Sequence, residues 1–164
     1  MAIKDALIAE LKHEATNTRK MLERIPTDKF DWKPHEKSMT LGRLAAHIAE
    51  TPLWVLRTIP VDEFDFAKNT FARKTYADTE ELLKVFDDKQ ADAIASLETA
   101  SDEILNAPYI LRRGDHIIFQ LPRKVMLRNF TFNHIVHHRG QLSVYLRLLN
   151  IPVPGMYGPS ADES

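Results

Sequence analysis

The chain is 164 residues long and 44% of its residues are apolar, which is enough to bury one continuous core. Its 22 Lys and Arg residues balance 23 Asp and Glu residues, so the net charge of -1 excludes a global field that would attract nucleic acid or an anionic membrane. Cysteine is absent, which excludes disulfides, thiolate metal sites and a thiol nucleophile, and leaves nitrogen and oxygen as the metal ligands.

The N-terminal segment predicts a helix over residues 3–25, because apolar side chains recur there at helical spacing and Ile25-Pro26 ends the pattern. Charges within residues 1–14 interrupt the apolar stretch that a signal peptide requires. No window approaches the eighteen or so consecutive apolar residues of a membrane-spanning helix. We therefore expect one cytoplasmic domain over residues 1–164, without a membrane segment.

Residues 26–38 contain two prolines and the aromatic side chains of Phe30 and Trp32, with no sustained period. We interpret this segment as an ordered connection that its aromatic residues anchor to the core.

A second helix is predicted from Thr40, a suitable N-cap, to Pro60. Pro52 lies inside this pattern, lacks a backbone N–H and clashes with the carbonyl four residues before it. We therefore expect the helix to kink or break near Ile48.

Residues 61–77 show no regular pattern. Asp78 then offers an N-cap, and Glu81, three positions later, completes a capping box. This arrangement predicts a third helix that runs to about Leu97.

Apolar runs on both sides of the turn residues 112–115 predict either a short hairpin or an extended loop within residues 101–121. Pro122 suits the first turn of a helix, and the longest helical pattern in the chain runs from there to Asn150. Four long amphipathic segments with little strand signal predict an all-α fold, a four-helix bundle, whose topology this pattern leaves open.

The last helix carries a pair of histidines that predicts a metal site. His134 and His138 project within about 40° of each other, and two imidazoles at this spacing can share one ion. Their stripe should face the core because it includes apolar residues; its other members are Leu127, Phe130, Gln141, Tyr145 and Leu148. Gln141 or Tyr145 can orient a bound group.

His47, on the second helix, follows two alanines that allow close helix approach, and we predict that it is the third ligand. Three imidazoles leave coordination positions open, as in a catalytic or ligand-exchanging site. The alternative is a set of core histidines hydrogen-bonded to their neighbours without a metal.

The remaining histidines fit less well. His137 projects about 100° away from His138. It either donates a hydrogen bond to a partner outside the ligand set, or lines the mouth of the pocket, or is an exposed side chain without a role. His13, His35 and His116 are expected at the surface or in loops. Glu10 and His13 form a Glu-x-x-His motif, but a di-iron bundle needs two such motifs.

Other enzyme classes lack their motifs. The residue after His134 is not the glutamate of zinc peptidases, and neither a glycine-rich phosphate loop nor a serine nucleophile elbow is present. The proline-rich tail, residues 151–164, is expected to lie as a coil against the body. Within it Tyr157 is either a polar handle over a pocket or part of a turn that caps the end of the bundle.

Several short motifs carry a family resemblance: Trp-Lys-Pro at 32–34, Ser-Met-Thr-Leu-Gly-Arg-Leu-Ala-Ala-His-Ile at 38–48, Asn-His at 133–134, His-His-Arg-Gly-Gln-Leu at 137–142 and Tyr-Gly at 157–158. Over nearly the whole chain the sequence resembles the DinB-like family, also called the DinB and YfiT-like metalloenzymes. The resemblance implies an up-down-down-up four-helix bundle, frequently a homodimer, with nickel or zinc held by His47, His134 and His138. Pro52 departs from the plain pattern and can shift His47.

Members of this superfamily transfer thiol cofactors, isomerise maleylpyruvate or act as hydrolases, so the fold alone narrows the chemistry poorly. We expect a metal-dependent enzyme of the thiol-cofactor transferase or hydrolase type, acting on a small molecule such as a low-molecular-weight thiol. The alternative is a non-catalytic metal-binding or stress-associated protein. Neither reading involves nucleic acid.

Overall fold

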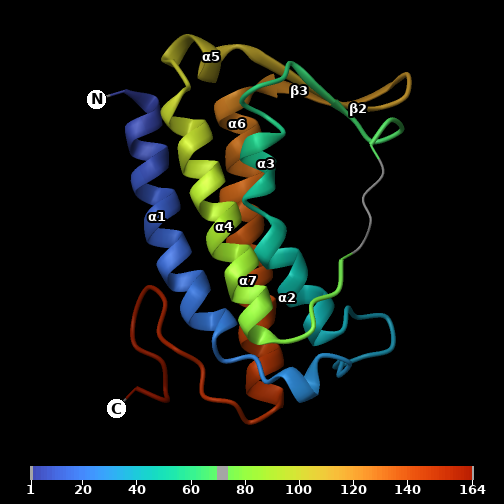
Figure 1. The fold of residues 1–164 in the computed structure, drawn as a ribbon, viewed down its shortest axis with the longest axis vertical. Coiled ribbons are helices and arrows are strands. Elements are labelled where there is room, and N and C mark those ends of the chain that lie inside the picture. Colours follow the sequence, from blue (N-terminus) through green and yellow to red (C-terminus); the bar gives the residue numbers. More distant parts are fainter. Residues whose placement is uncertain (1, 70–73, 164) are drawn as a thin grey trace.

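The structure is a computed structural model that describes residues 2–69 and 74–163. Long helices lie side by side, and a small sheet lies across one end of them (Figure 1). The elements in chain order are α1 (Ile3–Leu22), a 3-10 turn (Thr27–Lys29), α2 (Leu41–Glu50), α3 (Leu53–Leu56), β1 (Glu63–Asp65), α4 (Thr79–Glu98), α5 (Asp102–Asn106), β2 (Pro108–Arg113), β3 (His116–Pro122), α6 (Arg123–Leu127), a π-helical turn (Arg128–Phe132) and α7 (Asn133–Leu148).

The core lies between α1, α2, α4 and α7, since α1 and α2 each pack against both α4 and α7. Leu44, Phe86 and Leu142 are among its fully buried side chains. Phe30 and Trp32 of the connection after α1 pack against this core, as the sequence predicts. None of the helices in the described part of the chain is long and apolar enough to cross a membrane.

The start of α4 confirms its predicted N-cap. The Asp78 carboxylate accepts a hydrogen bond from the Glu81 backbone N–H at 2.8 Å, which satisfies one of the free amides of the first turn. The Glu81 carboxylate accepts in turn from the Ala77 N–H at 2.6 Å, one residue before the expected partner. The helix ends at Glu98, next to the predicted end.

The predicted interruption of the second helix is present, but a few residues later than expected. The N-cap Thr40 accepts from the Arg43 N–H at 3.2 Å, and α2 then runs to Glu50. Pro52 has no N–H to donate, so Thr51 closes a tighter turn by donating to the Ile48 carbonyl at 3.2 Å. The chain resumes as the short helix α3.

The prediction of an all-α four-helix bundle with up-down-down-up order was wrong. The fold is mixed α/β, with a three-stranded sheet in the order β1-β2-β3 beside the helices (Figure 1). Strand β1 pairs in parallel with β2, and β2 pairs antiparallel with β3. Of the two alternatives for residues 101–121, the structure therefore shows the hairpin.

Uneven burial of the three strands explains why their strand signal is weak in the sequence. In β2, Tyr109 and Leu111 are fully buried against the core, where Phe64 of β1 joins them. Strand β3 lies at the edge of the sheet, and its Ile117 and Phe119 are 48% and 44% exposed. An edge strand without a buried face has no alternating pattern, and β1 is too short to show one.

The last predicted helix is interrupted by a π-helical turn between α6 and α7. Its end agrees with the prediction: Asn150 has a positive φ of 57°, and the Ile151 N–H donates to the Leu146 carbonyl at 2.9 Å, as in a Schellman cap. Leu148, expected to face the core, is 57% exposed. The π turn changes the phase of the helix directly before His134.

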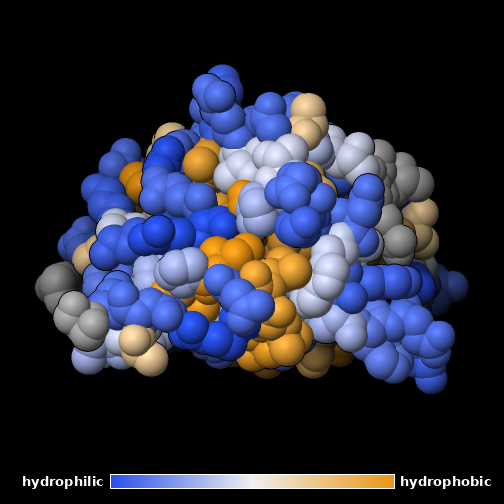
Figure 2. Space-filling view, turned by 90° about the horizontal axis from the view of Figure 1, so that it is seen from below, coloured by the Kyte–Doolittle hydropathy of each residue, from blue (hydrophilic) through white to orange (hydrophobic). Residues whose placement is uncertain are grey.

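The C-terminal tail lies against the body as a coil, as predicted. The Tyr157 hydroxyl donates to the Glu14 carboxylate of α1 at 2.8 Å, and Arg147 of α7 pairs with Asp162 at 2.6 Å. Figure 2 views the molecule from this end and shows hydrophilic residues around a central hydrophobic area.

Asp65 joins β1 to the turn of the hairpin, and this contact predicts a pH-dependent stability. Its buried carboxylate accepts hydrogen bonds from the N–H groups of Ala67 at 2.8 Å and Gly114 at 2.9 Å. These bonds, that of Gly114 first, hold the pKa of Asp65 below its ordinary value of 3.8. A lowered pKa stabilises the fold above the unfolded pKa, and the gain is lost as the pH falls through the folded one.

We therefore expect Asp65→Asn to be less stable than the wild type at neutral pH, by a margin that shrinks below about pH 4. Urea denaturation of both proteins between pH 7 and pH 3 measures this margin. A margin that does not change with pH would show that the charge of Asp65 contributes nothing.

Candidate metal centre

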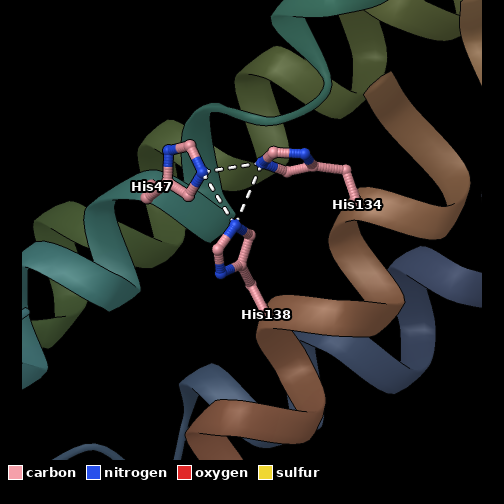
Figure 3. A group of neighbouring side chains, drawn as sticks. All are labelled: His47, His134 and His138. Atoms are coloured by element: carbon pink, nitrogen blue, oxygen red, sulfur yellow. Dashed lines mark hydrogen bonds between the residues drawn. The ribbon is translucent and has the colours of Figure 1, made fainter. Parts of the chain in front are cut away.

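Three histidines from two helices converge on one point (Figure 3). His47 projects from the last turn of α2, and His134 and His138 project from the first two turns of α7. The Nε2 atom of His47 lies 2.7 Å from that of His134 and 3.1 Å from that of His138, and the last two are 3.0 Å apart. The three residues singled out from sequence are therefore brought together.

Small and apolar neighbours allow this convergence. Ala45 and Ala46, directly before His47, are buried in the core between the helices, as are Ile135 and Leu142 of α7. Because alanine has only a β-carbon, α2 can lie close enough to α7 for an imidazole to bridge the gap.

Burial keeps the three imidazoles neutral at physiological pH. His138 is buried and the other two are half-buried. Desolvation, with smaller contributions from the neighbouring histidines, lowers the pKa of His47 and of His134 to about 4. Desolvation likewise lowers the pKa of His138. A neutral imidazole has the free lone pair that a metal ion requires.

Gln141 fixes the tautomer of His138. The Nδ1–H of His138 donates to the Gln141 side-chain oxygen at 2.8 Å, so its Nε2 carries a lone pair directed at the other two rings. The three Nε2 atoms form three close pairs, and a hydrogen bond in any pair needs a proton on one nitrogen and a lone pair on the other. Each neutral Nε2 has only one of the two, so hydrogen bonds can satisfy at most two of the three pairs. A cation at the centre would satisfy all three lone pairs.

The donor set fits a divalent transition metal of the zinc or nickel kind, for which imidazole is a suitable ligand. Nitrogens about 2.0–2.1 Å from one tetrahedral ion are roughly 3.3–3.4 Å apart. The separations here, from 2.7 to 3.1 Å, are slightly shorter, so a small outward rotation of the rings would accommodate the ion. Three protein ligands leave one position for water or substrate.

A cavity of about 250 Å³ opens beside His47. Its lining combines two arginines, one carboxylate, one hydroxyl and two aromatic side chains with that histidine: Arg43, His47, Glu50, Thr51, Trp54, Arg57 and Phe66. The Glu50 carboxylate already accepts a hydrogen bond from the Tyr76 hydroxyl at 2.8 Å. The candidate centre therefore adjoins a space for a small molecule.

Sequence reasoning did not single out these cavity residues, although a signal for some of them is present. At helical spacing, residues four before, three after and seven after His47 share its side of the helix. These residues are Arg43, Glu50 and Trp54. Phe66 comes from the loop after β1, a strand that the sequence did not predict.

The other candidate residues lie outside the triad. His137 is exposed, although its ring is 4.8 Å from that of His138. Tyr145 donates its hydroxyl to the Met39 carbonyl at 3.2 Å and packs edge-on against Trp32. Tyr157 lies on the α1 side of α7, and its hydroxyl is held by Glu14.

The surface assignments are correct: His13, His35 and His116 are exposed. The carboxylate of Glu10, part of the Glu-x-x-His motif, pairs with Arg128 at 2.5 Å. Within residues 2–69 and 74–163 the histidine triad is the one group of three potential ligand side chains close enough to hold an ion.

Comparison with known proteins shows the family of the chain. The model of the DinB family matches residues 1–164. The uncharacterized protein YrdA of Bacillus subtilis (strain 168) is 25% identical over 160 residues, which cover 97% of this chain and 90% of YrdA. The uncharacterized protein YjoA of the same strain is 28% identical over 133 residues, 79% of this chain and 80% of YjoA.

Solved structures show the same fold. A DinB-like protein from Bacillus cereus ATCC 10987 superposes with a TM-score of 0.70 at 22% identity, covering 89% of this chain and 92% of that one. The DinB-like protein YjoA from Bacillus subtilis gives a TM-score of 0.70 at 21% identity, covering 90% and 95%. At these sequence identities the similarity shows the fold alone.

Proposed function

We propose that this chain, which belongs to the DinB family, is a metal-dependent enzyme of the thiol-cofactor transferase or hydrolase type. Its divalent ion, nickel or zinc, would be held by His47, His134 and His138. The observation that carries the proposal is the convergence of three Nε2 atoms beside a cavity that can admit a small molecule.

When bound, such an ion supplies Lewis acidity, which lowers the pKa of a water or thiol or polarises an electrophile. The residues of the chain would hold the ion and organise its surroundings. Gln141 keeps the lone pair of His138 Nε2 directed inward, and Trp54 and Phe66 exclude water from one side of the cavity. A chain without cysteine would take any reacting thiol from its substrate.

One observation favours the alternative, a non-catalytic metal-binding or stress-associated protein. Glu50 is the carboxylate among the described residues that line the cavity, and its Oε1 atom accepts a hydrogen bond from Tyr76. The lining thus offers one carboxylate as a general base, and one of its two oxygens is engaged.

Elemental analysis of protein purified without an affinity tag tests the proposal. We expect about one equivalent of nickel or zinc per chain, removable by a chelator, and metal-dependent turnover of a thiol with an electrophile or of an ester. One equivalent of metal that raises the melting temperature, without turnover in either assay, would favour the alternative. Absence of bound metal would refute both. The homodimer and the cytoplasmic location stay predictions.

The contact between Gln141 and His138 predicts a graded effect on metal affinity. Gln141→Ala removes the acceptor of the Nδ1–H, so we expect zinc affinity to fall by roughly 10–100-fold. Gln141→Glu keeps an acceptor and should keep the affinity. Competition with a chromophoric chelator measures both constants.

Gln120→Ala is the matched control, because Gln120 is exposed on β3, away from the triad. Equal affinity in Gln141→Ala and Gln120→Ala would contradict the assigned role of Gln141.

A further inference from the structure

We propose that the cavity beside His47 binds a small monocarboxylate with a flat apolar body, and that Arg43 is the group that recognises the carboxylate. That this anion is the substrate, with its reacting end toward the histidine triad, rests on the proposed function. The anion site itself rests on the residues of the cavity.

Arg43 has a buried hydrogen-bond donor, its Nη1 atom, without an acceptor among the described residues. A buried donor without an acceptor destabilises the fold, and a charged donor does so more strongly. A ligand that brings an oxyanion to this atom would remove that destabilisation, and guanidinium groups pair well with carboxylates.

The position of Arg43 on α2 directs a ligand toward the triad. Arg43 lies one turn before His47, and both line the same cavity. Arg43 also borders a second cavity, of about 440 Å³, with Phe30 and Tyr76. The first cavity alone includes a residue of the triad, so a ligand held there can have one end on Arg43 and the other beside His47.

An aromatic wall shapes the rest of the cavity. The Trp54 ring packs edge-on against Phe66, with centroids 6.1 Å apart, and is tilted against Phe130 at 5.2 Å. The guanidinium of Arg57 lies over Trp54, 5.3 Å from its centroid. Such walls favour flat apolar groups. A volume of about 250 Å³ is below the range of roughly 300–1,000 Å³ that suits drug-sized ligands, so the ligand is small.

The charges of the lining select a monoanion. In the metal-free protein, Arg43 and Arg57 contribute two positive charges and Glu50 one negative charge, so the ionised side chains of the lining sum to +1. A carboxylate balances this charge. A phosphate monoester, which is close to a dianion at pH 7, would exceed it and be repelled by Glu50.

Isothermal titration of the protein with phenylacetate, before and after metal loading, tests this assignment, with neutral phenylacetamide and dianionic phenyl phosphate as comparison ligands. In the metal-free protein, where the side chains of the lining alone select the anion, we expect phenylacetate to bind most tightly. In Arg43→Gln its affinity should fall at least tenfold, because a charge-assisted hydrogen bond is lost. Arg43→Lys keeps the charge without the planar guanidinium, so its affinity for phenylacetate should lie between those of the wild type and Arg43→Gln. NMR contacts from the phenyl ring to Trp54 place the ligand in the first cavity.

Arg24→Gln is the matched control, because it removes the same charge from an exposed position after α1. Metal content is measured for every variant, which separates the two proposals. If phenylacetate binds the wild type and Arg43→Gln equally, binds as weakly as its amide, or contacts Tyr76 instead of Trp54, the anion site is refuted while the metal proposal stands. If phenylacetate binding depends on Arg43 in a protein that takes up no metal, the anion site stands and the proposed function fails.

Discussion

His138→Ala should lose its metal and any metal-dependent activity. The substitution removes one of three nitrogen ligands and also the contact with Gln141. Removing an outer partner of a ligand typically costs roughly 10–100-fold in affinity, and removing the ligand itself should cost more than that. Elemental analysis after dialysis against a weak chelator, together with a zinc competition titration, measures the loss.

The loss should occur without unfolding. Removal of His138 leaves the apolar core between α2 and α7 in place, since Ala45, Ile135 and Leu142 do not depend on its ring. Leu142→Ala is the matched control on the same helix, one turn later. Because Leu142 is fully buried, we expect it to reduce the free energy of unfolding by about 2–5 kcal/mol and to leave the metal stoichiometry unchanged.

Chemical denaturation of the metal-free proteins measures the free energy of unfolding of both variants. Metal is left out because it would stabilise only the variant that retains it. Retention of a full equivalent of metal by His138→Ala would refute the ligand assignment. Loss of metal by Leu142→Ala while it remains folded would show that the site depends on helix packing more than on this imidazole.

Each histidine of the triad could be singled out from sequence by a local signal, although the packing of α2 against α7 that brings them together is not local. His134 and His138 share a face through their spacing alone, and the alanines before His47 indicate close helix contact. One neighbour on the same stripe was assigned wrongly, since Leu148 was expected to face the core and is exposed. Periodicity places Leu148 on the stripe but does not show that the last turn of α7 is exposed there.

The sheet and the cavity depend on contacts between distant segments, and these leave little local signal. Strand β1 is three residues long and owes its register to β2, more than forty residues later, where Phe64 pairs with Leu111. The cavity wall needs Phe66 from the loop that follows β1 to pack beside Trp54. Hydrophobic periodicity describes one segment at a time, so it cannot reveal either.

Arg139→Met should destabilise the protein about as much as a severe core truncation. Arg139 and Glu14 join α7 to α1 with side chains that are 3% and 9% exposed, at 2.6 Å. Arg139 also donates to the Thr18 hydroxyl at 3.0 Å and contacts the Tyr157 hydroxyl. Removing one partner of a buried ion pair leaves the other charge uncompensated, and such changes cost about 3–5 kcal/mol.

A double-mutant cycle separates this penalty from the net contribution of the pair. If the uncompensated carboxylate is the cause, Glu14→Leu combined with Arg139→Met should recover most of the stability lost in Arg139→Met, since a buried pair replaced by apolar residues of similar volume is often neutral. Urea denaturation of the single and double variants measures the coupling. A double variant no more stable than Arg139→Met would assign the loss to the bonds with Thr18 and Tyr157. Because Arg139 points to α1 and away from the triad, metal stoichiometry should be unchanged in every folded variant of the cycle.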